Sequence, residues 1–180
     1  MRDRIKHCLF IMSFALLSLT AAPRSAKAVA FEPNTWHAQA AIGPSIRLGN
    51  LLGGSRAYGT VAVQGEYIIS EWLTGVGDVT LGFAGTVPLR FHVGSRLRWP
   101  GLNLPISPWV QAQFTAGRVF DVLGANLTVL GGRLALGSDY FFTAQLSGGM
   151  LLGFDLMSTL GQRPAFYGVV DILFGASYAF

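Results

Sequence analysis

The residues of this sequence that most resemble a catalytic set are His37, His92 and Ser95. A histidine can activate a serine nucleophile only when the two side chains meet within hydrogen-bond distance. His92 and Ser95 are separated by an odd number of positions. If the segment is an extended strand, their side chains point to opposite faces. We therefore expect no catalytic residues at this pair.

The sequence also contains few residues that could bind a metal or a cofactor. Its one cysteine, Cys8, lies near the N-terminus, and only His37 and His92 follow it as histidines. Zinc sites usually combine several cysteines and histidines at short spacing. The glycine pairs, for example Gly53-Gly54 and Gly131-Gly132, lack the pattern of a phosphate-binding loop. We predict neither a metal nor a cofactor.

Residues 1–30 have the pattern of a signal peptide. Basic residues near the N-terminus precede an apolar run from Leu9 to Leu19, which is followed by small residues. The run is shorter than the roughly 20 residues that a membrane-spanning helix needs. Cleavage fits after Ala28 or after Ala30. We favour the second site, which leaves residues 31–180 as one mature domain. Such a leader predicts export into the periplasm.

Removing this leader changes the charge balance. The whole chain has 13 Lys and Arg against nine Asp and Glu, but residues 31–180 have eight of each kind. The net positive charge therefore belongs to the leader, and we expect no nucleic-acid partner. The remaining chain is apolar on average, yet it lacks an apolar stretch long enough for a transmembrane helix. Both facts fit strands in which every second side chain faces lipid.

The alternation is clearest at the C-terminal end. Asp171 and Ser177 share one face with Tyr167, whereas large apolar residues form the other. A helix would scatter these two sets around its circumference, so the pattern predicts a strand. The apolar face comprises Phe166, Gly168, Val170, Ile172, Phe174, Ala176, Tyr178 and Phe180.

The same period of two recurs along the chain. Between Leu89 and Arg98, for example, apolar residues alternate with three arginines and His92. The fold class that we predict is all-β, an eight-stranded antiparallel transmembrane barrel with both termini on the periplasmic side. The expected strands lie near residues 36–47, 57–69, 73–83, 89–98, 109–117, 127–142, 146–156 and 166–180.

The polar faces of these strands would meet inside the barrel. The interior of an eight-stranded barrel is only wide enough for side chains to fill, so paired charges are expected to plug it. A conducting or ligand-bearing lumen remains the alternative. The predicted network comprises Glu66, Asp78, Asp139, Asp155 and Asp171 with Arg90, Arg96, Arg98 and Arg133, accompanied by His37, His92, Gln39, Gln64, Gln111 and Gln113.

Hairpin geometry predicts specific partners within this network. A turn near residues 85–87 would place Asp78 beside Gly94 and diagonal to His92 and Arg96, within ion-pair reach. The same reasoning across the last hairpins places Asp155 diagonal to Arg133.

Aromatic residues are expected near the strand ends. Two segments, 65–73 and 138–146, share an acid, a tyrosine, two apolar residues and a serine or threonine. We interpret both as periplasmic turns, held by Ser70 and Thr143. Amphipathic rings favour the membrane boundary. The predicted periplasmic girdle comprises Tyr67, Trp99, Tyr140 and Tyr178, and the tryptophans Trp36, Trp72 and Trp109 are also expected at strand ends.

Together these features resemble the small outer-membrane barrels of the OmpA/OmpX type. The most specific element is the terminal pattern of Ile172, Phe174, Tyr178 and Phe180, which resembles the signal read by the barrel-insertion machinery. The resemblance implies a monomeric protein in the bacterial outer membrane, with its lipids and that machinery as partners. Three roles stay open: a structural or membrane-integrity protein, a narrow solute channel, and an enzyme that modifies lipid A.

Overall fold

The computed structural model describes residues 32–48, 57–83, 87–99, 106–120, 126–160 and 165–180. The expected signal peptide and its cleavage site lie outside these residues. No helix among the described residues is long and apolar enough to cross a membrane. The eight strands are β1 (Trp36–Leu48), β2 (Ala57–Ile68), β3 (Leu73–Phe83), β4 (Val87–Arg98), β5 (Ile106–Phe120), β6 (Asn126–Phe141), β7 (Leu146–Leu160) and β8 (Phe166–Ala179).

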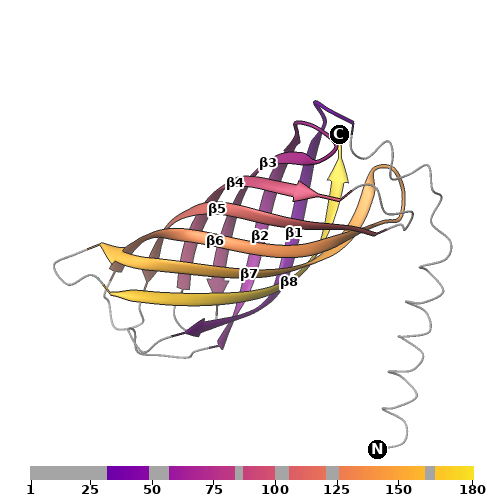
Figure 1. Cartoon of the computed structure of the whole chain (residues 1–180). Helices are drawn as coiled ribbons and strands as arrows, with labels where there is room; N and C mark the ends of the chain where they lie inside the picture. The colour runs from indigo at the N-terminus through magenta and orange to yellow at the C-terminus, as the bar shows by residue number, and fades with distance from the viewer. Residues whose placement is uncertain (1–31, 49–56, 84–86, 100–105, 121–125, 161–164) are drawn as a thin grey trace, which may run out of the picture.

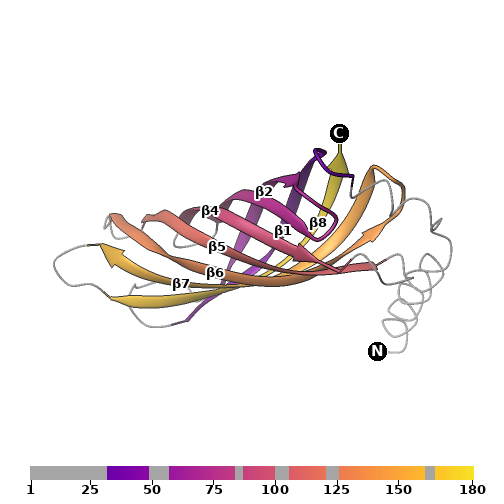
Figure 2. The same ribbon diagram turned by 45° about the horizontal axis from the view of Figure 1, so that its top comes forward.

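The strands form one closed antiparallel barrel in sequence order (Figure 1). β1 pairs with β8 as well as with β2, so no sheet edge is left open. His37 pairs with Ala179, which puts the start of β1 and the end of β8 at the same end of the barrel. We call this the terminal end and the opposite one the far end (Figure 2). The predicted eight-stranded barrel is confirmed.

The two faces of the wall differ in the way that the alternation predicts. Phe174 is 55% exposed on the outer face, whereas Asp171 on the same strand is fully buried. Phe91 and Arg90 show the same contrast on β4. A soluble barrel with an apolar interior would have the reverse arrangement.

Two tight turns at the terminal end join β2 to β3 and β6 to β7. The amide of Leu73 donates to Ser70 Oγ at 3.1 Å, and the amide of Leu146 donates to Thr143 Oγ1 at 2.9 Å. Each side chain therefore satisfies a backbone donor of its turn. The predicted role of Ser70 and Thr143 is confirmed.

The strand pairing differs from the expected register in two hairpins. Asp78 pairs with His92, not with Gly94, because β3 and β4 are joined by residues 84–86 and pair symmetrically about residue 85. Arg133 lies directly opposite Asp155 instead of diagonal to it. Several strands also extend further toward the far end than predicted, because pairing continues through Val87, Phe120 and Leu160.

Two adjacent glycines in β6 have different steric surroundings. A Cβ on Gly131 would lie 2.0 Å from the carbonyl oxygen of Leu156 in β7. A Cβ on Gly132 would meet no atom closer than 3.7 Å. The wall thus requires glycine at the first position and tolerates a methyl group at the second.

We predict that Gly131→Ala lowers the free energy of unfolding by about 1–3 kcal/mol, the usual cost of overpacking. Gly132→Ala should change it by less than about 0.5 kcal/mol. Urea unfolding of the refolded barrels in detergent measures both. Equal stability of the two variants would contradict this account of the wall.

Candidate functional site

Four charged side chains form a closed ring inside the far half of the barrel. Arg90 bonds to Asp155 and, at 3.0 Å, to Asp171. Arg133 contacts the same two carboxylates, at 3.1 Å from Asp155 and 2.8 Å from Asp171. Each arginine therefore bridges both acids, and each acid receives both arginines. Opposite charges alternate around this ring, as a buried network requires.

His92 joins this ring to a third acid. Its Nδ1 lies 2.5 Å from Asp78 Oδ1, and its Nε2 lies 3.3 Å from Asp155 Oδ1. Gln113 donates to the other oxygen of Asp78 at 2.6 Å. The imidazole is thus held between two carboxylates, and it links β3 to β7 across the lumen.

A second charged cluster lies toward the terminal end. Glu66 accepts a hydrogen bond from Arg96 at 2.6 Å and another from Arg98. Arg98 also donates to Asp139 at 2.6 Å, and Gln64 donates to Glu66 at 2.6 Å. Two arginines therefore balance two acids in this terminal cluster.

Trp109 belongs to the terminal cluster, so its prediction as a strand-end ring at the membrane boundary is wrong. Its side chain is only 1% exposed and faces the lumen. Arg96 stacks over the indole with its Cζ 3.8 Å from the ring centroid, a contact that attracts a cation to the ring face. Trp109 lies two residues before Gln111 and four before Gln113, so all three side chains point to the same face of the strand. This alternation in the sequence already indicated that Trp109 faces the lumen.

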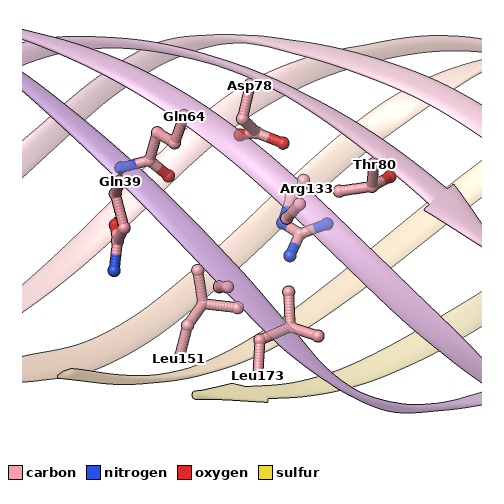
Figure 3. A pocket seen from close by; sticks show the side chains of 9 residues that line it. Gln39, Gln64, Asp78, Thr80, Arg133, Leu151 and Leu173 are labelled. Carbon is pink, nitrogen blue, oxygen red and sulfur yellow. Dashed lines mark hydrogen bonds between the residues drawn. The ribbon is translucent and has the colours of Figure 1, made fainter. Parts of the chain in front are cut away.

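Little space remains between the side chains in the middle of the lumen. A cavity of about 10 Å³ lies near the middle of the lumen, roughly the size that holds one water. Figure 3 shows the amide of Gln64 beside Gln39 and the Arg133 guanidinium turned into this space, with Leu151 and Leu173 on the facing wall. Side chains therefore fill the middle of the lumen.

An apolar cluster that the sequence analysis missed lies inside the barrel near the far end. Its members are buried and come from β2, β5, β6, β7 and β8. Inner positions near those strand ends change from charged to apolar, and following the period of two further would have found them. This far-end apolar cluster comprises Tyr58, Val119, Val129, Met157, Tyr167 and Val169, with Leu127 packed against it.

The nine charged residues of the predicted network, together with His92, face the lumen and are buried. They divide between the ring with its His92 extension and the terminal cluster. Arg47 is a further buried arginine, near the far end of β1, that the prediction did not include. The ten residues are Glu66, Asp78, Arg90, His92, Arg96, Arg98, Arg133, Asp139, Asp155 and Asp171.

The histidine and serine weighed as a catalytic pair lie on opposite sides of the wall. His92 is buried in the lumen, whereas Ser95 is exposed on the outer face. These two residues therefore do not form a nucleophile and base. Within the described part of the chain, no group of three or more His, Cys, Asp or Glu residues is placed to hold a metal ion.

The aromatic residues predicted as a girdle lie on the outer face near the terminal end. Tyr67 packs against Trp36 with ring centroids 4.9 Å apart, and its hydroxyl donates to Asn34 Oδ1 at 2.8 Å. Tyr140 packs edge-on against Phe142, and Tyr178 against Phe180. Trp99 is 44% exposed at the end of β4. A band of rings thus surrounds this end of the barrel.

Comparison with solved structures finds several small bacterial barrels of the same fold. Neisserial surface protein A superposes with a TM-score of 0.70 at 13% identity, covering 81% of this chain and 97% of that protein. The N-terminal β-barrel domain of Pseudomonas aeruginosa OprF gives 0.59 at 10% identity, with 82% and 98% coverage. The outer membrane protein OprG from the same species gives 0.55 at 13% identity, with 84% and 98% coverage.

The sequence matches no protein-family model, and no curated protein matches it significantly. The shared architecture nevertheless defines the class: the chain has the fold of the small eight-stranded outer-membrane β-barrels. The resemblance drawn from the sequence is therefore confirmed at the level of the fold. Within that class, this chain is a barrel with buried charged residues inside it.

Proposed function

We propose that the protein is an integral outer-membrane barrel with a closed lumen and a structural role in membrane integrity. The terminal end would face the periplasm and the far end the outside, as in other barrels of even strand number. The apolar outer wall would contact membrane lipids, and the aromatic band near the terminal end would lie at the periplasmic boundary.

The filled lumen is the observation that carries this proposal. The ring, His92 and the terminal cluster occupy the interior, and the far-end apolar cluster lies beyond the ring, where it would narrow the lumen. A water-filled channel would have a continuous polar passage, but the cavity near the middle has a volume of only about 10 Å³. An apolar constriction also resists hydration. Both features favour a plugged barrel over a solute channel.

The biogenesis of the barrel would use its last strand. Ile172, Phe174, Tyr178 and Phe180 lie at alternate positions, and the last three are exposed on the outer face. This outward aromatic pattern supports recognition by the barrel-insertion machinery after export through the periplasm. We propose that the barrel then functions as a monomer, without a catalytic site or cofactor.

Conductance in planar lipid bilayers tests the closed lumen. We predict no steady single-channel current from the purified barrel under conditions in which a general porin conducts. A heat-dependent shift in gel mobility should first show that the same preparation contains folded barrels. Steady current from folded protein would contradict the proposal and favour the narrow channel.

A further inference from the structure

Arg118 is an exception among the charged residues of the barrel wall. Within the strands that the structure describes, every other charged side chain is buried in the lumen, whereas Arg118 is exposed on the outer face of β5. It lies close to the far end, two positions before the strand ends at Phe120. A cation at this depth is tolerated near a membrane boundary but is costly at the midplane.

Two polar residues lie beside Arg118 on the β6 side of the same face. Thr128 in β6 lies directly opposite it, and Asn126 lies opposite Phe120. Both polar residues are exposed. We call Arg118, Asn126 and Thr128 the outer polar patch. The outward residues at the far-end termini of β1, β3, β7 and β8 are large and apolar, namely Leu48, Phe83, Leu160 and Phe166.

The guanidinium of Arg118 is not engaged by an acid of the described structure. Among the described residues, it contacts the Phe120 ring, whose centroid lies 5.8 Å from Cζ. None of the ion pairs among the described residues includes it. A guanidinium presents five donors in a planar fork that fits the oxygens of a phosphate. The amide of Asn126 and the hydroxyl of Thr128 add further donors beside it.

The same wall has an apolar hollow of a kind that can accommodate a lipid acyl chain. A hollow of about 540 Å³ on the outer face is lined mainly by apolar residues of β4 to β8, including Val110, Ala112, Leu134 and Phe154. Ala112 lies six residues from Arg118 along β5, or about 20 Å at the rise of a strand. That separation is within the roughly 30 Å of a bilayer core. β5, β6 and β7 lie side by side along this wall (Figure 2).

We propose that the outer polar patch binds a phosphate of a phosphorylated glycolipid in the outer leaflet, with an acyl chain of that lipid lying along β5 to β7 in the hollow. The inference rests on the proposed function, because only a barrel whose far end faces outward brings Arg118 to that leaflet. The fork of Arg118 would hold the phosphate, and Thr128 and Asn126 would donate to its free oxygens.

Lipid retention in native mass spectrometry tests this binding. The full barrel is refolded in detergent and mixed with diphosphorylated lipid A, with the same lipid after removal of both phosphates, or with phosphatidylglycerol. We expect diphosphorylated lipid A to be retained most strongly. Arg118→Gln should weaken its retention about fivefold, the effect of one interfacial cation. Arg118→Lys should restore much of it, because the charge is kept.

Arg47→Gln is the matched control, because Arg47 lies near the same end but faces the lumen. A heat-dependent shift in gel mobility shows that each variant is a folded barrel. The proposal is overturned by equal retention of phosphorylated and dephosphorylated lipid, by unchanged retention in Arg118→Gln, or by equal retention of phosphatidylglycerol. Any of these three results would overturn lipid binding but would leave the proposed closed lumen intact. Conversely, a steady current in planar bilayers would overturn the closed lumen and would not change lipid retention in detergent.

Discussion

Replacing Arg90 by methionine is expected to lower the free energy of unfolding by about 3–5 kcal/mol, because it leaves a buried carboxylate without its full complement of positive charge. Asp171 and Asp155 would then share Arg133 as their remaining arginine. Asp171→Asn should have a comparable cost, since Arg90 and Arg133 would then share Asp155. Urea unfolding in detergent, followed by tryptophan fluorescence, measures both.

The double variant Arg90→Met with Asp171→Asn distinguishes a charge network from general damage to the lumen. It removes one charge of each sign and leaves Arg133 paired with Asp155. We expect its cost to be smaller than the sum of the two single costs by at least about 1 kcal/mol, as for residues that interact directly. Strictly additive costs would show that the ring is not an energetic unit.

Glu66→Gln is expected to have the second large effect, about 3 kcal/mol or more. The substitution preserves the size of the side chain but removes the carboxylate that receives both Arg96 and Arg98. Asp139 would then remain as the acid facing two buried guanidinium groups. The free energy of unfolding in urea again provides the measurement.

Glu71→Gln serves as the control for this change of charge. Glu71 lies in the exposed turn between β2 and β3, where it accepts a hydrogen bond from Trp72 at 2.8 Å. Surface substitutions of this kind usually change stability by less than about 0.5 kcal/mol. If the two glutamate variants were equally stable, the terminal cluster would not contribute to the fold as described.

The fold could be predicted from the sequence because each strand has one apolar face and one polar face. Parity alone placed Arg90, His92, Arg96 and Arg98 inside and Phe91 outside, as the structure has them. The register was harder to predict. The position of Asp78 depended on where the turn between β3 and β4 is centred, and a shift of one residue in that centre moved its partner from Gly94 to His92.

Partners across the lumen could not be predicted from hairpin geometry. Arg90 in β4 reaches Asp155 in β7 and Asp171 in β8, strands that do not neighbour its own. Such contacts depend on the stagger of the closed barrel, which follows from all eight registers together. Arg133 and Asp155 lie on adjacent strands. Hairpin geometry therefore did predict that these two residues are close together.

Trp109 shows how a general preference can conflict with local parity. Tryptophan is enriched at membrane boundaries, and this residue lies near the start of β5. Its position between Ser107 and Gln111 on the inner face nevertheless places it in the lumen beneath Arg96. Where the two signals disagree, the alternation along the strand is the stronger, because a change of face would require a break in the pairing.

The direction of the side chains underlies every proposal made for this protein. Quenching by lipids with brominated acyl chains tests it most directly, in variants that keep a single tryptophan. One variant retains Trp109 alone, and the other carries Phe154→Trp with the four native tryptophans replaced by phenylalanine. We predict strong quenching at position 154 and little at Trp109. Strong quenching of Trp109 with an unaffected position 154 would contradict a barrel that is apolar outside and charged within.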